Sequence, residues 1–186
     1  MPDPGRHDAH DAEDDDEARF LATYDPTSYE QTAVTVDIVV LSVGDDGPAV
    51  LLVERGGHPF RGSWALPGGF LDPGDATLDA AARRELLEET GVDIGAEAWS
   101  AHFAQLGAYG DVGRDPRQRT VSVVFAGVVA GAPTPTAGSD AARAEVIPVR
   151  DLALDPASAG HVRLAFDHAR IVRDAYERLG PELQHG

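Results

Sequence analysis

The stretch GGFLDPGDATLDAAARRELLEETGV, residues 68–92, constrains the fold of this chain more than any other part of the sequence. Near its end, Glu85, Glu88 and Glu89 follow one another at intervals of three residues and one residue. On a helix this spacing places Glu88 and Glu89 within about 60° of Glu85 around the axis. Like charges so placed repel one another and destabilise the helix. A bound cation would offset that repulsion, and the hard, oxygen-seeking cations Mg²⁺ and Mn²⁺ suit carboxylates.

The residues around the glutamates predict a strand, a sharp turn and an amphipathic helix in succession. The apolar run 64–66 leads into the breaker cluster Pro67-Gly68-Gly69. Gly91 is a plausible helix stop, and either Asp75 or Thr77 supplies the N-cap. The side chains expected to face the core share helical spacing: Leu78, Ala81, Ala82, Leu86 and Thr90.

This segment closely resembles the Nudix box, in which Gly, five residues, Glu and seven more residues precede Arg-Glu-apolar-x-Glu-Glu-x-Gly-apolar. The second half, Arg84 to Val92, matches at every position. From Gly69, five residues lead to Asp75, where the box has Glu, and eight residues separate Asp75 from Arg84. One residue is therefore inserted in the loop 75–77. Because the first acidic residue is mainly structural in the family, the departure concerns loop conformation rather than metal binding.

The resemblance implies an α/β/α sandwich with a mixed β-sheet between helices, and hydrolysis of a nucleoside diphosphate linked to another moiety. It also implies that Glu85, Glu88 and Glu89 hold Mg²⁺ or Mn²⁺. The backbone carbonyl of Gly69 is an additional candidate ligand, and Arg84 would orient the carboxylates rather than react. Which carboxylate acts as the general base varies within the family, and the sequence leaves this open.

The rest of the chain predicts a β-rich domain of the α/β class that ends in an amphipathic helix. The expected elements are strands at 32–43, 49–54, 63–66, 104–109, 120–129 and 144–149, and a helix at 161–179. The turn Asp45-Asp46-Gly47-Pro48 should join the first two strands as a hairpin.

Composition divides the chain into four parts. Residues 1–19 are rich in His, Asp and Glu and poor in apolar residues, which predicts a disordered acidic tail. A lead-in arm at 20–31 follows, then residues 32–180, which the resemblance implies form a Nudix hydrolase domain, and a C-terminal tail at 181–186.

Charge and residue usage exclude several classes of function. The formal net charge of -17 opposes binding to nucleic acid, which needs a basic surface. The absence of cysteine excludes disulfides, thiolate zinc sites and a cysteine nucleophile. No apolar run approaches the length of a membrane span or a signal peptide, so we expect no membrane partner and, by elimination, a cytoplasmic location.

Further segments resemble the ADP-ribose pyrophosphatase-like branch of the Nudix family. They are TAVTVDIVV with AVLLVERGG, then HPFRGSWALPGGF, GDVGRDPRQRTVSVVF and LAFDHARIVRDAYERL. This resemblance implies that the substrate is ADP-ribose or a related nucleotide sugar. It also implies a homodimer, which agrees with apolar residues in the arm 20–30 and the terminal helix beyond obvious core needs.

Four charged residues outside the glutamate cluster are candidate substrate ligands. Arg55 precedes Gly56-Gly57, and Arg61 lies in the following loop; a guanidinium donates two parallel hydrogen bonds to a phosphate. Arg117 lies in an arginine-rich turn, which suits a diphosphate, a terminal ribose or a partner subunit. Glu145 is an acidic candidate on a facing segment, either as an extra metal ligand or as a general base. A solvated surface charge remains the alternative at each position.

Other functions compete with this interpretation. A house-cleaning pyrophosphatase for nucleoside triphosphates such as 8-oxo-dGTP would use the same metal site. A ligand-sensing transcriptional regulator would require a DNA-binding module after the last predicted helix, where this chain ends. A catalytically silent binding module is disfavoured because none of the box carboxylates is missing.

Overall fold

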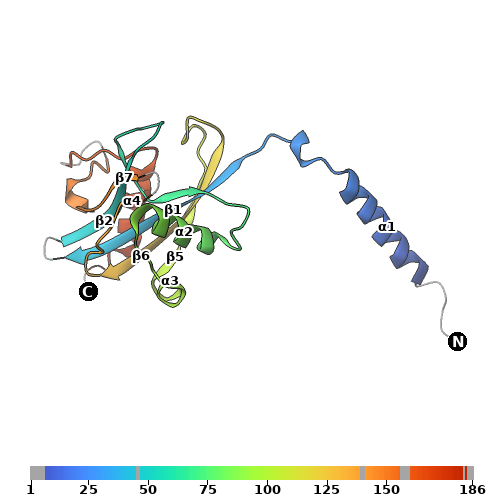
Figure 1. Ribbon diagram of the computed structural model, residues 1–186, viewed down its shortest axis with the longest axis horizontal. Helices are drawn as coiled ribbons and strands as arrows, with labels where there is room; N and C mark the ends of the chain where they lie inside the picture. Colours follow the sequence, from blue (N-terminus) through green and yellow to red (C-terminus); the bar gives the residue numbers. More distant parts are fainter. Residues whose placement is uncertain (1–6, 45–46, 139–140, 156–159, 182, 184–186) are drawn as a thin grey trace. The chain divides into compact units, whose positions relative to one another are not determined.

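The computed structural model describes residues 7–44, 47–138, 141–155, 160–181 and 183. The chain divides between Gln31 and Thr32 into two compact units. The larger unit contains all the strands and most of the helices (Figure 1). Its elements are β1 (Ala33–Gly44), β2 (Gly47–Arg55), β3 (Trp64–Ala65), β4 (Gly68–Phe70), α2 (Leu78–Thr90), α3 (Ala96–His102), β5 (Phe103–Tyr109), β6 (Thr120–Ala130), β7 (Ala141–Pro148), the 3-10 helix η2 (Val149–Asp151) and α4 (His168–Leu179).

The strands form one mixed seven-stranded sheet. Its main path runs β3-β2-β1-β6-β5, while β4 also pairs with β1 and β7 also pairs with β2. β1 and β6 are parallel, with Val36 opposite Val123, and the other pairs are antiparallel. β1 and β2 form the expected hairpin, although the predicted turn residues 45 and 46 lie outside the described residues.

Alternation along β1 divides its buried side chains between two cores, one on each face of the sheet. Val36 and Ile38 pack with Leu86 of α2 on one face. Val39 packs with Ile171 of α4 on the other face. Each such aliphatic side chain contributes about 1.5–3 kcal/mol when it is fully buried. The expected α/β/α sandwich is therefore confirmed, with α2 and α4 on opposite faces.

The helix that carries the glutamates has the boundaries that its sequence favours. The hydroxyl of Thr77 accepts a hydrogen bond from the backbone N–H of Ala80 at 3.1 Å, so Thr77 rather than Asp75 is the N-cap. Gly91 ends the helix in the left-handed region, with φ of 67°. The predicted core-facing residues Ala81, Ala82, Leu86 and Thr90 are buried, and Leu78 is partly buried against the same core.

Three parts of the larger unit differ from the expectations. The Pro-Gly-Gly turn continues into β4, and α3 has no predicted counterpart. The last helix begins at His168 instead of residue 161, because Leu164 forms a β-bridge with Trp64 and Phe166 has a non-helical φ of 54°. His161 therefore lies outside the helix.

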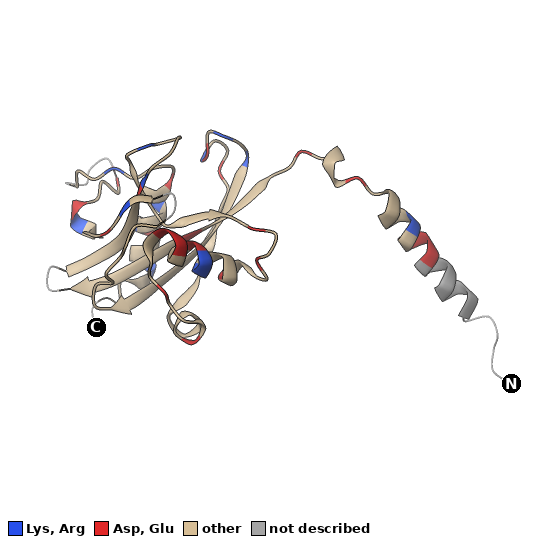
Figure 2. Cartoon of the chain, viewed as in Figure 1, with Lys and Arg blue, Asp and Glu red and all other residues tan. Residues whose placement is uncertain are grey.

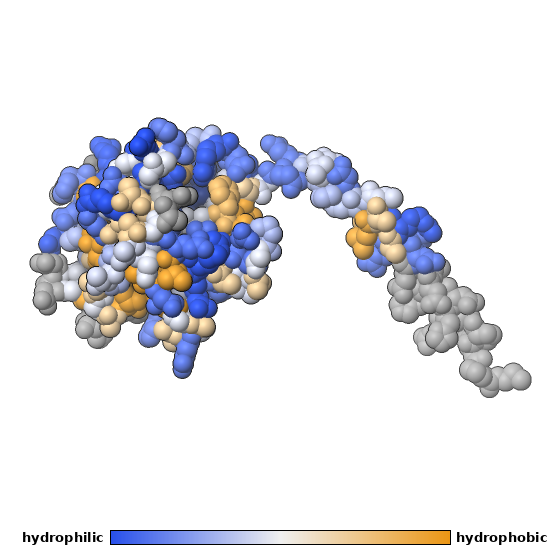
Figure 3. Space-filling view, in the orientation of Figure 1, coloured by the Kyte–Doolittle hydropathy of each residue, from blue (hydrophilic) through white to orange (hydrophobic). Residues whose placement is uncertain are grey.

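The smaller unit contains a helix where the sequence predicts disorder. α1 (His7–Thr23) and the 3-10 helix η1 (Pro26–Ser28) cover most of it, and residues 1–6 lie outside the described residues. A helix forms its backbone hydrogen bonds locally, between residues four apart along the chain. Apolar side chains of α1 nevertheless form an exposed patch (Figure 3), with Phe20 exposed by 60% and Leu21 by 62%.

The segment 181–186, expected as a tail, is described only at residues 181 and 183. Leu183 is buried against the α4 side of the core, which extends the packed domain past residue 180. Among the described residues, the helices are too short or too polar to cross a lipid bilayer.

Candidate active site

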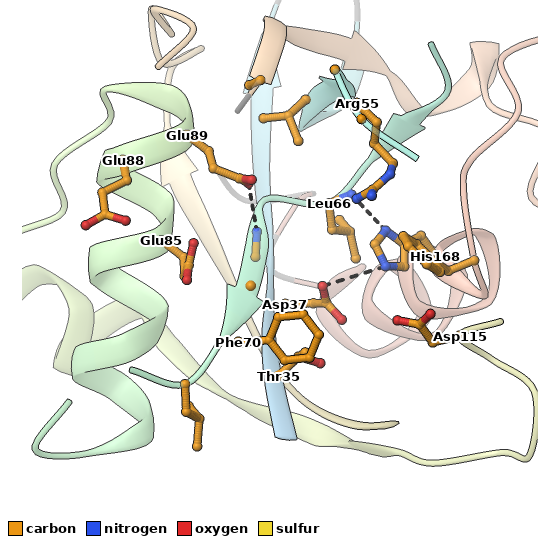
Figure 4. Close-up of a pocket in the computed structure, with 18 of the residues that line it drawn as sticks. Thr35, Asp37, Arg55, Leu66, Phe70, Glu85, Glu88, Glu89, Asp115 and His168 are labelled. Carbon is orange, nitrogen blue, oxygen red and sulfur yellow. Dashed lines mark hydrogen bonds and ion pairs between the residues drawn. The ribbon is translucent and has the colours of Figure 1, made fainter. Parts of the chain in front are cut away.

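A cavity of about 1010 Å³ opens between α2, β4, the end of β2, the loop 110–119 and the start of α4 (Figure 4). Its polar lining is mostly charged and consists of Thr35, Asp37, Glu54, Arg55, His58, Asp72, Arg84, Glu85, Glu88, Glu89, Arg114, Asp115, Arg117 and His168. Two aromatic rings, Phe70 and Phe166, also line it. The cavity thus combines one carboxylate-rich wall with a second wall that carries arginines and aromatic rings.

Helix α2 contributes Glu85, Glu88 and Glu89 to the cavity wall, as the helical spacing predicts. Glu89 Oε2 accepts a hydrogen bond from the backbone N–H of Gly68 at 3.0 Å. Gly69 lies against Glu85, because a Cβ atom at this position would come within 2.5 Å of Glu85 Oε1. Only glycine allows the backbone to approach the carboxylate this closely.

Arg84 ties the glutamates to the loop that precedes the helix. Its guanidinium donates two hydrogen bonds to Asp75, from Nε at 3.0 Å and from Nη2 at 2.8 Å. Nη1 contacts Glu85 at 2.8 Å and Glu88 at 3.2 Å, and Figure 2 shows the opposite charges side by side on α2. The inserted residue in the loop therefore leaves Asp75 within reach of Arg84, and this bond lowers the pKa of the Asp75 carboxyl.

Burial makes two carboxylates of α2, those of Glu85 and Glu89, harder to ionise. It raises the pKa of Glu85, and it raises the pKa of Glu89 to about 7. A divalent cation would reverse this effect, because it favours the charged forms of its ligands. The oxygen donors therefore have the chemistry that Mg²⁺ or Mn²⁺ requires.

The carboxylates do not form a closed metal cage in their present conformation. Within the described ranges, no three His, Asp or Glu side chains are gathered closely enough to hold a metal ion. Glu85 and Glu88 contact Arg84 instead, and Glu89 contacts Gly68. Binding of one ion by all three glutamates would therefore require their carboxylates to move closer together.

The opposite wall combines guanidinium groups with aromatic rings. Arg55 Cζ lies 4.9 Å from the centre of the Phe166 ring, and Arg117 Cζ lies 5.2 Å from that of Phe70. Arg117 also forms an ion pair with Asp115 at 2.6 Å, and Arg55 donates to a backbone carbonyl. Burial lowers the pKa of Arg55. These contacts hold two planar cations at the cavity, where they can face an anionic ligand.

The structure brings two of the four candidate substrate ligands to the cavity. Arg55 and Arg117 line it, whereas Arg61 and Glu145 do not. Arg61 is exposed in the loop between β2 and β3. Glu145 is a residue of β7 opposite Leu52 of β2, and its carboxylate forms an ion pair with Arg143.

A buried polar group at the base of the cavity was not predicted. Asp37 lies in the middle of apolar β1 and accepts a hydrogen bond from Ser122. Arg114, which the sequence places in a charged turn, is buried and bonds Asp167 at 2.8 Å and Asp37 at 3.4 Å. The sequence contains a signal for this group, because Asp37 is the single carboxylate in the apolar run TVDIVVL. A buried charge needs a partner.

The chain matches the NUDIX domain model over residues 31–167. Together with the sandwich fold and the glutamate helix in the cavity wall, this match shows that the chain belongs to the Nudix family.

Three relatives illustrate its place in the family. The NUDIX domain of Shewanella oneidensis NrtR, solved in complex with ADP ribose, has a TM-score of 0.76 and 34% identity, covering 88% of this chain and 98% of that one. The ADP-ribose pyrophosphatase of Methanocaldococcus jannaschii is 36% identical over 146 residues, 78% of this chain and 74% of that protein. The ADPR responsive transcriptional repressor NtrR of Acinetobacter baylyi is 32% identical over 171 residues. This last match covers 91% of this chain but only 63% of the repressor.

Proposed function

We propose that this protein is a metal-dependent Nudix hydrolase that cleaves the diphosphate linkage of ADP-ribose or a related nucleotide sugar. The observation that carries the proposal is the complete glutamate set of α2 in the wall of a cavity that also presents Arg55 and Arg117. The similarity to an ADP-ribose pyrophosphatase and to a domain bound to ADP ribose supports the same substrate class. A cavity of about 1010 Å³ is large enough for such a ligand, since small-molecule sites measure about 300–1,000 Å³.

In this proposal Glu85, Glu88 and Glu89 hold Mg²⁺ or Mn²⁺, with the Gly69 carbonyl as a further ligand. The ion would screen the diphosphate charge and lower the pKa of a coordinated water. Arg84 orients the carboxylates, as its contacts with Glu85 and Glu88 suggest.

The arginine and aromatic wall binds the substrate in this account. Arg55 and Arg117 donate hydrogen bonds to the diphosphate or the terminal ribose. Phe70 and Phe166 provide flat apolar surfaces beside these cations, on which a base or a sugar can pack. Arg61 and Glu145 do not line the cavity, so this proposal assigns them no contact with the substrate of their own chain.

The first test is removal of the metal. Protein stripped with a chelator should not hydrolyse ADP-ribose, and Mg²⁺ or Mn²⁺ should restore turnover. Glu88→Gln should lower kcat by at least about a hundredfold in the presence of metal, because it removes a charged ligand. Glu177→Gln, an exposed change on α4, is the matched control and should leave kcat unchanged. Turnover without metal, or full activity of Glu88→Gln, would contradict the proposal.

A second candidate function is ADP-ribose sensing within a transcriptional regulator. The similarity to the NtrR repressor favours it, because that match extends over 91% of this chain. The net charge of -17 opposes DNA binding by this chain itself, and the intact glutamate set favours hydrolysis. Calorimetry would separate the two functions, since a sensor should bind ADP-ribose in the presence of Mg²⁺ without cleaving it.

A further inference from the structure

His168, the first residue of α4, lies in the cavity wall beside Leu66, which precedes the glycine loop (Figure 4). Its side chain is 3% exposed, and its Nδ1 accepts a hydrogen bond from the backbone N–H of Leu66 at 2.9 Å. A ring nitrogen that accepts carries no proton, so the proton of the neutral ring is on Nε2. Burial lowers the pKa of His168, which agrees with a neutral ring.

Asp37 lies near the other side of the imidazole ring, beyond hydrogen-bond distance of Nε2. His168 Nε2 lies 3.6 Å from Asp37 Oδ1, and Asp37 is itself held by Ser122 and Arg114. The ring therefore has a hydrogen bond at Nδ1 and a carboxylate near Nε2, and it is almost fully buried. A ring held in this way is a rigid acceptor for the Leu66 N–H.

The backbone that His168 holds leads directly to the glutamates of α2. Only Pro67 separates Leu66 from Gly68, whose N–H donates to Glu89. Gly68 has no room to shift toward β1, because a Cβ atom there would lie 2.2 Å from the Val36 carbonyl oxygen. A displacement of Leu66 would therefore be transmitted along the loop toward α2.

We propose that His168 is a positioning residue, which holds the segment 66–69 so that Glu89 and Glu85 have the geometry that metal binding requires. The inference rests on the proposed function for its effect on turnover, but not for its effect on the loop. His168 has no direct contact with the reacting groups in this account. It acts through the Leu66 N–H, and the loss of such supporting bonds typically lowers metal affinity or activity by about 10–100-fold.

Three substitutions at this position separate the acceptor from the volume of the ring. His168→Asn keeps an oxygen acceptor close to the position of Nδ1. His168→Leu has a similar size but leaves the Leu66 N–H unpaired. His168→Gln reaches toward Asp37 and also leaves that N–H unpaired. Ile171→Ala removes buried volume one turn further along α4 and controls for loss of stability alone.

The measurements are kcat, KM, the dissociation constant of Mn²⁺ from the spin-resonance signal of the free ion, and amide hydrogen exchange. In His168→Leu and His168→Gln, kcat should fall and Mn²⁺ binding should weaken at least about tenfold, with KM within about twofold of wild type. His168→Asn should recover most of both losses. Amide hydrogen exchange in peptides that span residues 64–70 should accelerate in His168→Leu and His168→Gln but not in Ile171→Ala.

Several results would overturn the inference. One is that both His168→Leu and His168→Gln bind Mn²⁺ with wild-type affinity and exchange the amide hydrogens of residues 64–70 at the wild-type rate. Another is that Ile171→Ala, at the same melting temperature as the His168 variants, loses as much kcat and Mn²⁺ affinity as they do. That result would show an effect of stability only. If wild-type protein binds Mn²⁺ but hydrolyses none of the nucleotides, the proposed function fails while the affinity and exchange data still decide the role of His168. If His168→Leu does not fold, the comparison of His168→Asn with His168→Gln decides whether His168 positions the loop.

Discussion

Glu89 is the most buried of the three glutamates proposed to hold metal, and this burial has a measurable consequence. Its pKa is raised from 4.5 to about 7, chiefly by loss of solvation. Between these two values, metal-free folded protein retains a proton that the unfolded chain has released. Stability from this group therefore falls as pH rises from about 4.5 to 7 and then stays constant.

Glu89→Gln should remove this pH dependence in the presence of chelator. Glutamine keeps an oxygen that can accept from Gly68, but it is neutral at every pH. At pH 8 the variant should be more stable than wild type, by on the order of 3 kcal/mol at most, and near pH 4.5 the difference should vanish. Urea unfolding at the two pH values measures this. A stability difference of the same size at both would show that Glu89 is not a buried acid.

At the residue scale, the sequence predicted the side chains whose spacing is local. Glu85, Glu88 and Glu89 were found because one helix turn brings them together. His168 was not assigned to the site, because its bond to Leu66 spans 102 residues and depends on the packing of α4 against the sheet. Motif spacing contains no information on such a contact.

At the scale of elements, long apolar strands and the capped helix α2 were predictable. β1, β2 and β6 have continuous buried runs, and Gly91 ends α2 where the sequence favours an end. The predicted start of α4 at residue 161 was wrong. The apolar spacing continues through 161–167, but isolated β-bridges and a positive φ there prevent a helix. The prediction of a disordered acidic tail at 1–19 rests on composition, which reports the absence of a core and not the local hydrogen bonding of a helix such as α1.

The N-cap of α2 gives a test at this scale. Thr77→Ala should lower the free energy of unfolding by about 1 kcal/mol, because the backbone N–H of Ala80 loses its partner. Thr77→Ser keeps the hydroxyl and is the matched control. Urea unfolding of both variants measures the difference. A loss of unfolding free energy in Thr77→Ser as large as in Thr77→Ala would show that the methyl group of Thr77 matters rather than its capping hydroxyl.

At the scale of the whole molecule, we expect a homodimer in which the acidic segment 1–19 is dispensable. The exposed apolar side chains Phe20, Leu21 and Tyr24 are suited to burial in a protein contact. The charge of -17 on each chain opposes association, but salt at physiological concentration screens it beyond about 8 Å.

Light scattering at micromolar concentration and physiological salt should give the mass of two chains for the full protein. A variant that begins at Phe20 should have the mass of two shortened chains and keep the melting temperature and kcat of the full protein. A variant that begins at Thr32 should remain folded, because the larger unit is compact by itself, but should lose the dimer if the arm supplies the contact. A monomeric full-length protein would contradict the expected assembly, and loss of activity on removal of residues 1–19 would contradict their dispensability.

Substrate preference tests the central claim of a Nudix enzyme for ADP-ribose most directly. The measurement is kcat/KM with Mg²⁺ for ADP-ribose, NADH, a sugar nucleotide and 8-oxo-dGTP, all with one preparation of protein. ADP-ribose should be cleaved with the highest kcat/KM, because Arg55 and Arg117 can bind its diphosphate and the two aromatic rings beside them can pack on its base or sugar. A preference for 8-oxo-dGTP of tenfold or more would contradict this account and identify a house-cleaning pyrophosphatase.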